Sequence, residues 1–229
     1  MRQPRHLGHA GAWMPSVFAA VAMMVMSLVL SRGAPAEELR LEDPFAAVDG
    51  QPVTIGRLHL VLTQRFPGKD PQSLDAKLRA AAATQLVRQQ LALRSMLVQG
   101  GDAIRRESDA AVAEFKREVK KRGVPLANIA RARKCDERAI LDDVRWKHIW
   151  QRYLESQLTA ANLRRFYEQN PQRYGGSSFE QLQNALLLKK EASAAMFAAL
   201  VRRSADAKVE FFEAKLRPPE GYPIIPEKP

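Results

Sequence analysis

The chain has 229 residues, of which 36 are lysine or arginine and 25 are aspartate or glutamate, so its formal charge is +11. This length suffices for one domain with a hydrophobic core, with or without an appendage. A single cysteine, Cys135, excludes an internal disulfide, so the fold has to be stabilised by packing.

The first 36 residues predict a secretory signal peptide. An uncharged apolar run over residues 17–30 has arginines on both sides and is about 14 residues long, short of the roughly 20 that a membrane-spanning helix needs. Ala34 and Ala36 follow it with the small-x-small pattern of a signal-peptidase site. We therefore expect an exported protein of the periplasm or cell envelope. A retained membrane anchor that begins near Ala12 is the alternative.

The chain stays basic without this segment. Removal of its three arginines leaves 33 basic and 25 acidic side chains, a formal charge of +8. Nucleic acid is not an expected partner outside the cytoplasm, whereas an anionic membrane surface or an acidic polypeptide would match the charge. The densest basic runs, 115–123 and 130–138, are interrupted by apolar and acidic residues at helical spacing, which is typical of solvated helix faces.

Residues 45–54 predict a small β-hairpin that leads into a helix. Asp49 and Gly50 favour the positive φ angles of a tight hairpin turn, and Pro52 confines the second strand to a sheet edge. Thr54 is the expected N-cap of a helix over residues 55–64. Because one strand pair cannot bury a core, helices and a further strand are expected against it.

A long helical segment follows, capped by Ser73 and stopped by the glycine pair at 100–101. Its apolar residues fall on two faces, which predicts contacts on two sides. The first face carries Leu78, Ala82, Leu86, Leu93, Met96 and Leu97, and the second carries Val87, Leu91 and Val98. Another helix is expected to begin at Ser108 or Asp109 and to end before Gly123.

Residues 125–134 predict a short helix at most, and residues 136–158 predict a longer helix with a wide apolar stripe. The stripe consists of Trp146, Ile149, Trp150, Tyr153, Leu154 and Leu158. It can be core or a groove for a peptide, and we expect core for most of it. Thr159 is the expected N-cap of the next helix, which Asn170 and Pro171 end.

The last third of the chain predicts a helix and a terminal strand. Ser177 and Glu180 match the capping-box pattern S-x-x-E and predict a helix from Phe179 to about Arg203. A strand is predicted over residues 208–212. The tail beyond it holds five prolines, too many for regular structure.

No constellation of residues suggests catalysis or metal binding. His59 and His148 lie far apart in the sequence, and neither has a second histidine at ligand spacing. Cys135 follows Arg133 and Lys134, which could lower its pKa, but it has no partner of the triad type. No catalytic residue, metal ligand or cofactor is therefore predicted.

The order of these elements resembles the chaperone module of the SurA and parvulin-type peptidyl-prolyl isomerase family of the cell envelope. The matching segments are residues 48–54 with D-G-x-P-[VI]-T, residues 85–91, residues 158–163, Phe166-Tyr167, and residues 170–174 with N-P-x-[RK]-[FY]. In that family the isomerase domain follows the N-P-x-[RK]-[FY] segment. Here the chain passes from Tyr174 through residues 175–178 to a helix that resembles the family's closing element, so the resemblance implies that the parvulin domain is missing.

The resemblance implies a mainly α fold, a SurA-like helical chaperone domain over residues 37–216 with a small β element formed by N-terminal and C-terminal strands. The closing helix and strand lie at residues 178–212, and a proline-rich tail follows at residues 217–229. We expect the strand near residues 45–48 to pair with the one near residues 209–212, because each needs a partner.

These features predict an ATP-independent, chaperone-like protein that binds unfolded or extended polypeptides and is not an enzyme. The candidate peptide contacts are Trp146, Trp150, Tyr153, Phe166 and Tyr167, of which at least half are expected in the core. The alternatives are a divergent peptidyl-prolyl isomerase homologue, or a scaffold for one partner with the proline-rich tail as a docking segment. A homodimer formed by exchange of the terminal helix and strand is also open.

Overall fold

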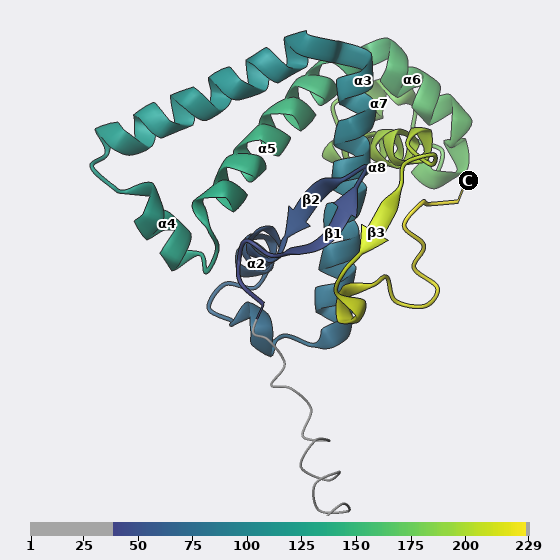
Figure 1. Cartoon of the computed structure of the whole chain (residues 1–229). Coiled ribbons are helices and arrows are strands. Elements are labelled where there is room, and N and C mark those ends of the chain that lie inside the picture. Colours follow the sequence, from purple (N-terminus) through teal and green to yellow (C-terminus); the bar gives the residue numbers. More distant parts are fainter. Residues whose placement is uncertain (1–38, 228–229) are drawn as a thin grey trace, which may run out of the picture. The chain divides into compact units, whose positions relative to one another are not determined.

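The structure, a computed structural model, describes residues 39–227 (Figure 1). It is mainly helical with a small antiparallel sheet, which confirms the predicted fold class at this coarse level. The described residues from Arg40 onward form one compact unit. The predicted signal peptide and the alternative anchor lie outside the described residues. None of the helices in the described part of the chain is long and apolar enough to span a bilayer.

The sheet brings the two ends of this unit together. Its strands are β1 (Pro44–Val48), β2 (Gln51–Thr54) and β3 (Val209–Phe211). The order is β2-β1-β3 with both pairings antiparallel, and Val48 faces Gln51 on one side and Val209 on the other. The predicted pairing between the N-terminal and C-terminal strands is therefore confirmed. In the structure, this pairing is within one chain.

Local sequence signals explain the hairpin and the first helix. Asp49 and Gly50 both have positive φ angles, 47° and 75°, as a two-residue hairpin turn requires. β2 is an edge strand, where the missing N–H of Pro52 does not interrupt the sheet. The Thr54 hydroxyl accepts a hydrogen bond from the backbone N–H of Arg57 at 3.3 Å and so caps α2 (Ile55–Arg65) as predicted.

The longest helix, α3 (Ala76–Lys121), begins later than expected. Asp75 caps it by accepting hydrogen bonds from Lys77 and Leu78, so the predicted cap at Ser73 is wrong. Ser73 instead ends the short 3₁₀ helix η1 (Pro71–Ser73), where its hydroxyl donates to the carbonyl of Asp70. A carboxylate one residue before the first helical position was thus the stronger N-cap.

The glycine pair bends α3 instead of ending it. Gly101 has φ 53° and ψ −141°, a non-helical conformation that a residue with a side chain rarely adopts. The helix resumes at once, so the predicted second start at Ser108 or Asp109 is wrong. The buried Ser108 hydroxyl donates to the carbonyl of Arg105 within the helix. Figure 1 shows the two halves of α3 at a sharp angle, with the second half beside α5.

The middle of the chain follows the sequence predictions closely. The elements are α4 (Leu126–Ala132), α5 (Glu137–Gln157), α6 (Ala160–Gln169) and the 3₁₀ helix η2 (Pro171–Tyr174). Asp136 caps α5 by accepting from the N–H of Ala139 at 2.8 Å. Thr159 caps α6, and the proline after Asn170 begins η2.

The predicted closing helix is two helices, α7 (Phe179–Leu182) and α8 (Leu186–Arg203). The capping box is real but lies one residue later than expected, between Ser178 and Gln181, so the pairing of Ser177 with Glu180 is wrong. The 3₁₀ helix η3 (Ala214–Leu216) follows β3. The rest of the tail, to the end of the described chain, has no regular structure, as predicted.

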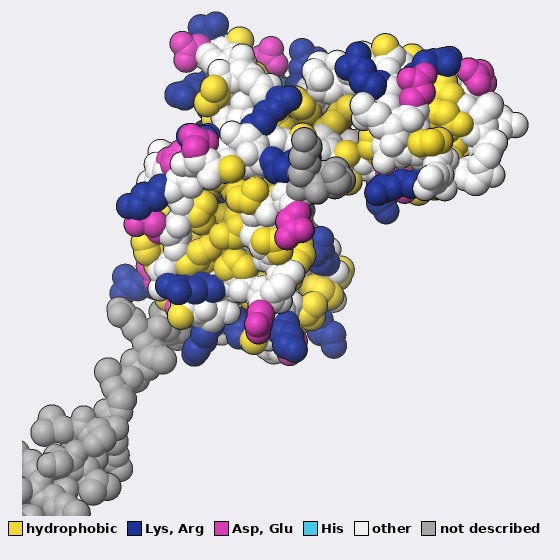
Figure 2. Space-filling view, turned by 90° about the vertical axis from the view of Figure 1, so that its right-hand side faces the viewer, with side chains coloured by type: hydrophobic (Ala, Val, Ile, Leu, Met, Phe, Trp, Pro, Cys, Tyr) yellow, Lys and Arg dark blue, Asp and Glu magenta, His cyan; other side chains and the backbone are white. Residues whose placement is uncertain are grey.

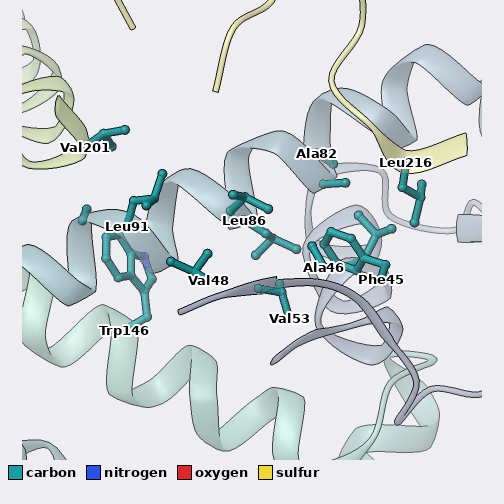
Figure 3. Close-up of a cluster of buried hydrophobic side chains, with 14 of the residues drawn as sticks. Phe45, Ala46, Val48, Val53, Ala82, Leu86, Leu91, Trp146, Val201 and Leu216 are labelled. Carbon is teal, nitrogen blue, oxygen red and sulfur yellow. The ribbon is translucent and has the colours of Figure 1, made fainter. Parts of the chain in front are cut away.

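The main core lies between the sheet and the first half of α3, with contributions from α2, α5, α8 and η3 (Figure 3). Phe45 of β1 and Leu216 of η3 are at one end of this cluster, and Trp146 of α5 is at the other. Both predicted faces of α3 contribute, since Leu86 and Leu91 are fully buried. Two expected core positions on α3 are exposed instead: Leu78 at 45% and Val98 at 78%.

Candidate functional site

An aromatic ladder runs along α5, as the stripe in the sequence indicated. Trp146 stacks on Trp150 with ring centroids 5.7 Å apart, and Trp150 stacks on Tyr153 at the same distance. Phe197 of α8 meets both tryptophans edge to face, at 6.2 and 5.8 Å. Such pairs stabilise packing by about 0.5–1.5 kcal/mol each beyond burial. The contacts of the ladder with Phe197 therefore stabilise the packing of α5 against α8.

The three residues of the ladder differ in exposure, since the first is buried and the other two are half-buried. Trp146 is 7% exposed, so this predicted peptide contact is a core residue. Trp150 is half-buried and packs against the main core. Tyr153 is also half-buried, and burial raises the pKa of its hydroxyl. Of the three, Tyr153 lines an open cleft.

Two clefts lie between α3 and α5, and Ile149 lines both of them; together they are what we call the α3–α5 groove. One has a volume of about 380 Å³, and its lining includes Ile104, His148 and Tyr153. The other has a volume of about 510 Å³ and extends to the hairpin turn; its apolar lining consists of Val48, Leu93, Leu97, Val98 and Ile149. The groove thus has an apolar floor at the bend of α3.

Charged side chains form the rim of the larger cleft. Arg94 donates to Asp49 at 2.6 Å and to Asp206 at 2.9 Å, which links α3 to the hairpin turn and to the approach to β3. Arg145 of α5 donates to Asp109 across the groove at 3.4 Å. Arg105 also lines this cleft, and within the described residues it has no ion-pair partner. The three arginines and three aspartates of the rim therefore balance in charge.

The other two predicted contacts belong to a different part of the molecule. Phe166 and Tyr167 of α6 pack in a small cluster with Tyr174 and Phe179. The Tyr167 hydroxyl donates to the carbonyl of Ser177 at 2.8 Å, and its ring stacks on Tyr174 at 5.6 Å. The structure therefore does not bring the five predicted residues together.

This small cluster surrounds the position where the resemblance places a missing domain. Gly175 and Gly176, with φ angles of 57° and 82°, turn the chain from η2 into α7. The Tyr174 hydroxyl donates to Glu191 of α8 at 2.7 Å; burial, with this carboxylate, raises the pKa of Tyr174 to about 12. The two sides of the loop are thus packed into one cluster.

Nucleophilic chemistry finds no support in the described residues. Burial, with the charge of Asp136, raises the pKa of Cys135 to about 11; the charge of Arg133 lowers this pKa, in the direction that the sequence suggested, but burial outweighs it. Burial also lowers the pKa of His59, whose Nδ1 lies 3.2 Å from the carbonyl of Lys134. No group of histidine, cysteine and acidic residues in the described range is arranged to hold a metal ion.

Sequence reasoning missed most residues of the α3–α5 groove. Ile104 and Arg105 reach it because α3 bends at Gly101 and folds its second half back beside α5. The adjacent glycines were the available signal, but the direction of the bend depends on contacts with α5. Comparisons of the chain with models of protein families, with curated proteins and with solved structures found no match.

Proposed function

We propose that this protein is an ATP-independent, chaperone-like protein of the cell envelope that binds unfolded or extended polypeptides in the α3–α5 groove. The observation that carries the proposal is the apolar surface at the bend of α3, where half-buried Leu93 and Leu97 line the groove and Val98, 78% exposed, lies at its edge. Apolar side chains that line an open concave surface are typical of a binding site.

The chemistry of the groove suits a polypeptide of variable sequence. Its lining is aliphatic, with Leu93, Leu97 and Ile149 in the groove and Val98 at the edge, and it supplies affinity that does not depend on a fixed hydrogen-bond pattern. Tyr153 adds an aromatic surface at one end. The basic charge of the whole chain would attract acidic clients at long range.

The resemblance to the SurA and parvulin-type family supports the same proposal. The family's chaperone module joins N-terminal and C-terminal segments, and here β1 pairs with β3. No isomerase activity belongs to the proposal, because Gly175 and Gly176 connect η2 directly to α7 where a catalytic domain would be inserted. Binding therefore requires neither a cofactor nor a nucleotide.

The test compares two equally exposed hydrophobic residues. Val98→Glu places a charge at the edge of the groove, whereas Leu186→Glu places one at the start of α8, where the side chain is 80% exposed and outside the groove lining. The assay is light scattering during aggregation of a chemically denatured outer-membrane-type protein. We expect the wild type and Leu186→Glu to suppress aggregation and Val98→Glu to lose most of this effect.

Circular dichroism and thermal melting of both variants serve as controls for folding. If Val98→Glu suppresses aggregation as well as the wild type does, the groove is not the binding site. If the wild type does not suppress aggregation at all, the chaperone proposal fails. A protease-coupled proline-peptide assay on the same samples is expected to show no rate above background, and a measurable rate would refute the absence of isomerase activity.

A further inference from the structure

The C-terminal tail beyond η3 lies along one face of the molecule as a docked segment without helix or strand. Figure 2 shows this face, on which hydrophobic side chains gather in a broad patch with charged side chains around it. A turn, closed by the N–H of Tyr222 on the carbonyl of Pro219 at 3.0 Å, precedes the docked residues. The segment that follows reads Tyr-Pro-Ile-Ile-Pro.

One arginine of α3 holds this segment through three hydrogen bonds. Arg88 donates from Nε to the carbonyl of Ile224 at 3.0 Å, and from Nη2 to the carbonyl of Pro223 at 2.5 Å. Its Nη1 donates to the hydroxyl of Tyr222 at 2.9 Å. The guanidinium also lies over the Tyr222 ring, 4.3 Å from the centroid, at a distance typical of a cation–π interaction.

Apolar packing and a second arginine complete the site. Ile224 and Ile225 are half-buried and pack against the main core. Arg202 of α8 donates to the carbonyl of Glu227 at 3.4 Å. The docked segment therefore lies between α3 and α8, on a surface that we call the tail groove, defined by Arg88, Arg202 and the core residues beneath the two isoleucines.

Most of the polar contacts that hold the docked segment are made to its peptide backbone. Three of the four polar contacts go to main-chain carbonyls, which every amino-acid sequence offers. Pro223 and Pro226 restrict the backbone to extended conformations and lack N–H groups, so the segment needs no sheet partner. The side chains that a bound segment needs are therefore an aromatic ring that packs under Arg88 and two aliphatic side chains that point toward the core.

We propose that the tail groove is a second polypeptide-binding site, which takes extended segments of another protein with an aromatic-proline-aliphatic pattern, and that the chain's own tail is its resident competitor. The residues that define this site are not those of the α3–α5 groove, so the proposal does not depend on the function proposed for that groove. The occupant observed in the structure defines the chemistry of the ligand.

The length of the linker between η3 and the docked segment determines how strongly the resident tail competes with an external segment for the tail groove. Only about five residues, 217–221, separate η3 from the docked segment, and short linkers give effective concentrations of about 1 mM. If the tail segment itself has an intrinsic Kd of about 100 µM for the groove, an effective concentration of about 1 mM would weaken the apparent binding of an external segment about tenfold. Release of the tail should therefore expose the site.

The test uses the full chain and a fluorescent peptide with the sequence of residues 218–227, PPEGYPIIPE. Ile224→Asp together with Ile225→Asp undocks the resident tail and leaves the groove unchanged. We expect fluorescence anisotropy to show binding to this double variant at least about tenfold tighter than to the wild type. The addition of Arg88→Ala should abolish binding, and a peptide with both isoleucines replaced by aspartate should not bind.

Equal binding to the wild type and the double variant, or binding that survives Arg88→Ala, would overturn the proposal. Tyr222→Ala, at a residue that is 39% exposed, provides a milder way to weaken the tail and should give an intermediate gain in affinity. If the wild type is a dimer that the double variant converts to a monomer, the ligand is the tail of a second copy, and the assignment to another protein is wrong. Neither readout involves aggregation, so failure here is distinguishable from failure of the chaperone proposal.

Discussion

Replacement of Phe45 by alanine tests the core that joins the sheet to the helices. Phe45 is 0% exposed and packs at the end of the main cluster near Leu216. Truncation of a fully buried phenylalanine costs about 3–5 kcal/mol, because both the transfer free energy and the packing around the ring are lost. This is a large part of the roughly 5–15 kcal/mol by which a domain is usually stable.

The matched control is Phe212→Ala. The Phe212 N–H donates to the carbonyl of Phe45 at 2.9 Å, so the two residues are neighbours in the backbone, but the Phe212 side chain is 58% exposed. Its truncation should change the free energy of unfolding by no more than about 0.5 kcal/mol. The two variants therefore differ in how deeply the truncated side chain is buried, and not in its position beside the sheet.

Urea unfolding followed by tryptophan fluorescence measures both effects, since Trp146 and Trp150 lie in or against this core. With a urea dependence of about 2 kcal/mol per molar, a loss of about 4 kcal/mol lowers the midpoint by about 2 M for Phe45→Ala. Phe212→Ala should leave the midpoint within about 0.3 M of the wild type. Equal midpoints for the two variants would refute the assigned core.

Three further predictions follow from the geometry. Gly101→Ala should destabilise the fold by about 1–3 kcal/mol in the same urea assay, because a φ of 53° is strained for a residue with a side chain. An unchanged midpoint would mean that the conformation of Gly101 does not maintain the bend of α3. Arg94 holds the pKa of Asp206 below its ordinary value of 3.8 by hydrogen bonding, so this stabilisation is present above that value and lost as the pH falls through the lowered pKa. The decline of the unfolding midpoint as the pH falls from about 5 to about 2 should be shallower in Arg94→Gln, and parallel curves would contradict this linkage. Cys135, with its pKa raised to about 11, should react with a thiol reagent at pH 8 about 100-fold more slowly in the native protein than in urea, whereas rapid native labelling would show that the thiol is accessible.

Features that depend on a few neighbouring residues were predictable from the sequence. The Asp49-Gly50 turn, the caps at Thr54 and Thr159 and the end of α6 before Pro171 all involve groups within four residues of each other, so their geometry is encoded locally. The pairing of β1 with β3 was predictable for a different reason, since a lone hairpin cannot bury its own faces.

Local signals were insufficient where two similar residues compete for one role. Ser73 and Asp75 both suit a helix cap, as do Ser177 and Ser178, and the choice in each case depends on neighbouring groups. Cys135 shows the same difficulty with charge: two of its sequence neighbours are basic, but its pKa is governed mainly by burial in a cluster that includes Leu60, which is distant in the chain. Sequence proximity therefore misled where desolvation dominates.

The candidate sites are products of the tertiary structure. The aromatic stripe of α5 was visible in the sequence, but only packing decided that Trp146 is core, that Tyr153 reaches the α3–α5 groove, and that Phe166 and Tyr167 pack elsewhere. The groove itself requires the bend in α3, and the tail groove requires contacts across more than 130 positions of the chain. Helix caps and turns are determined by interactions within a few residues, whereas a concave surface exists only where distant segments meet, and that depends on how the whole chain buries its apolar surface.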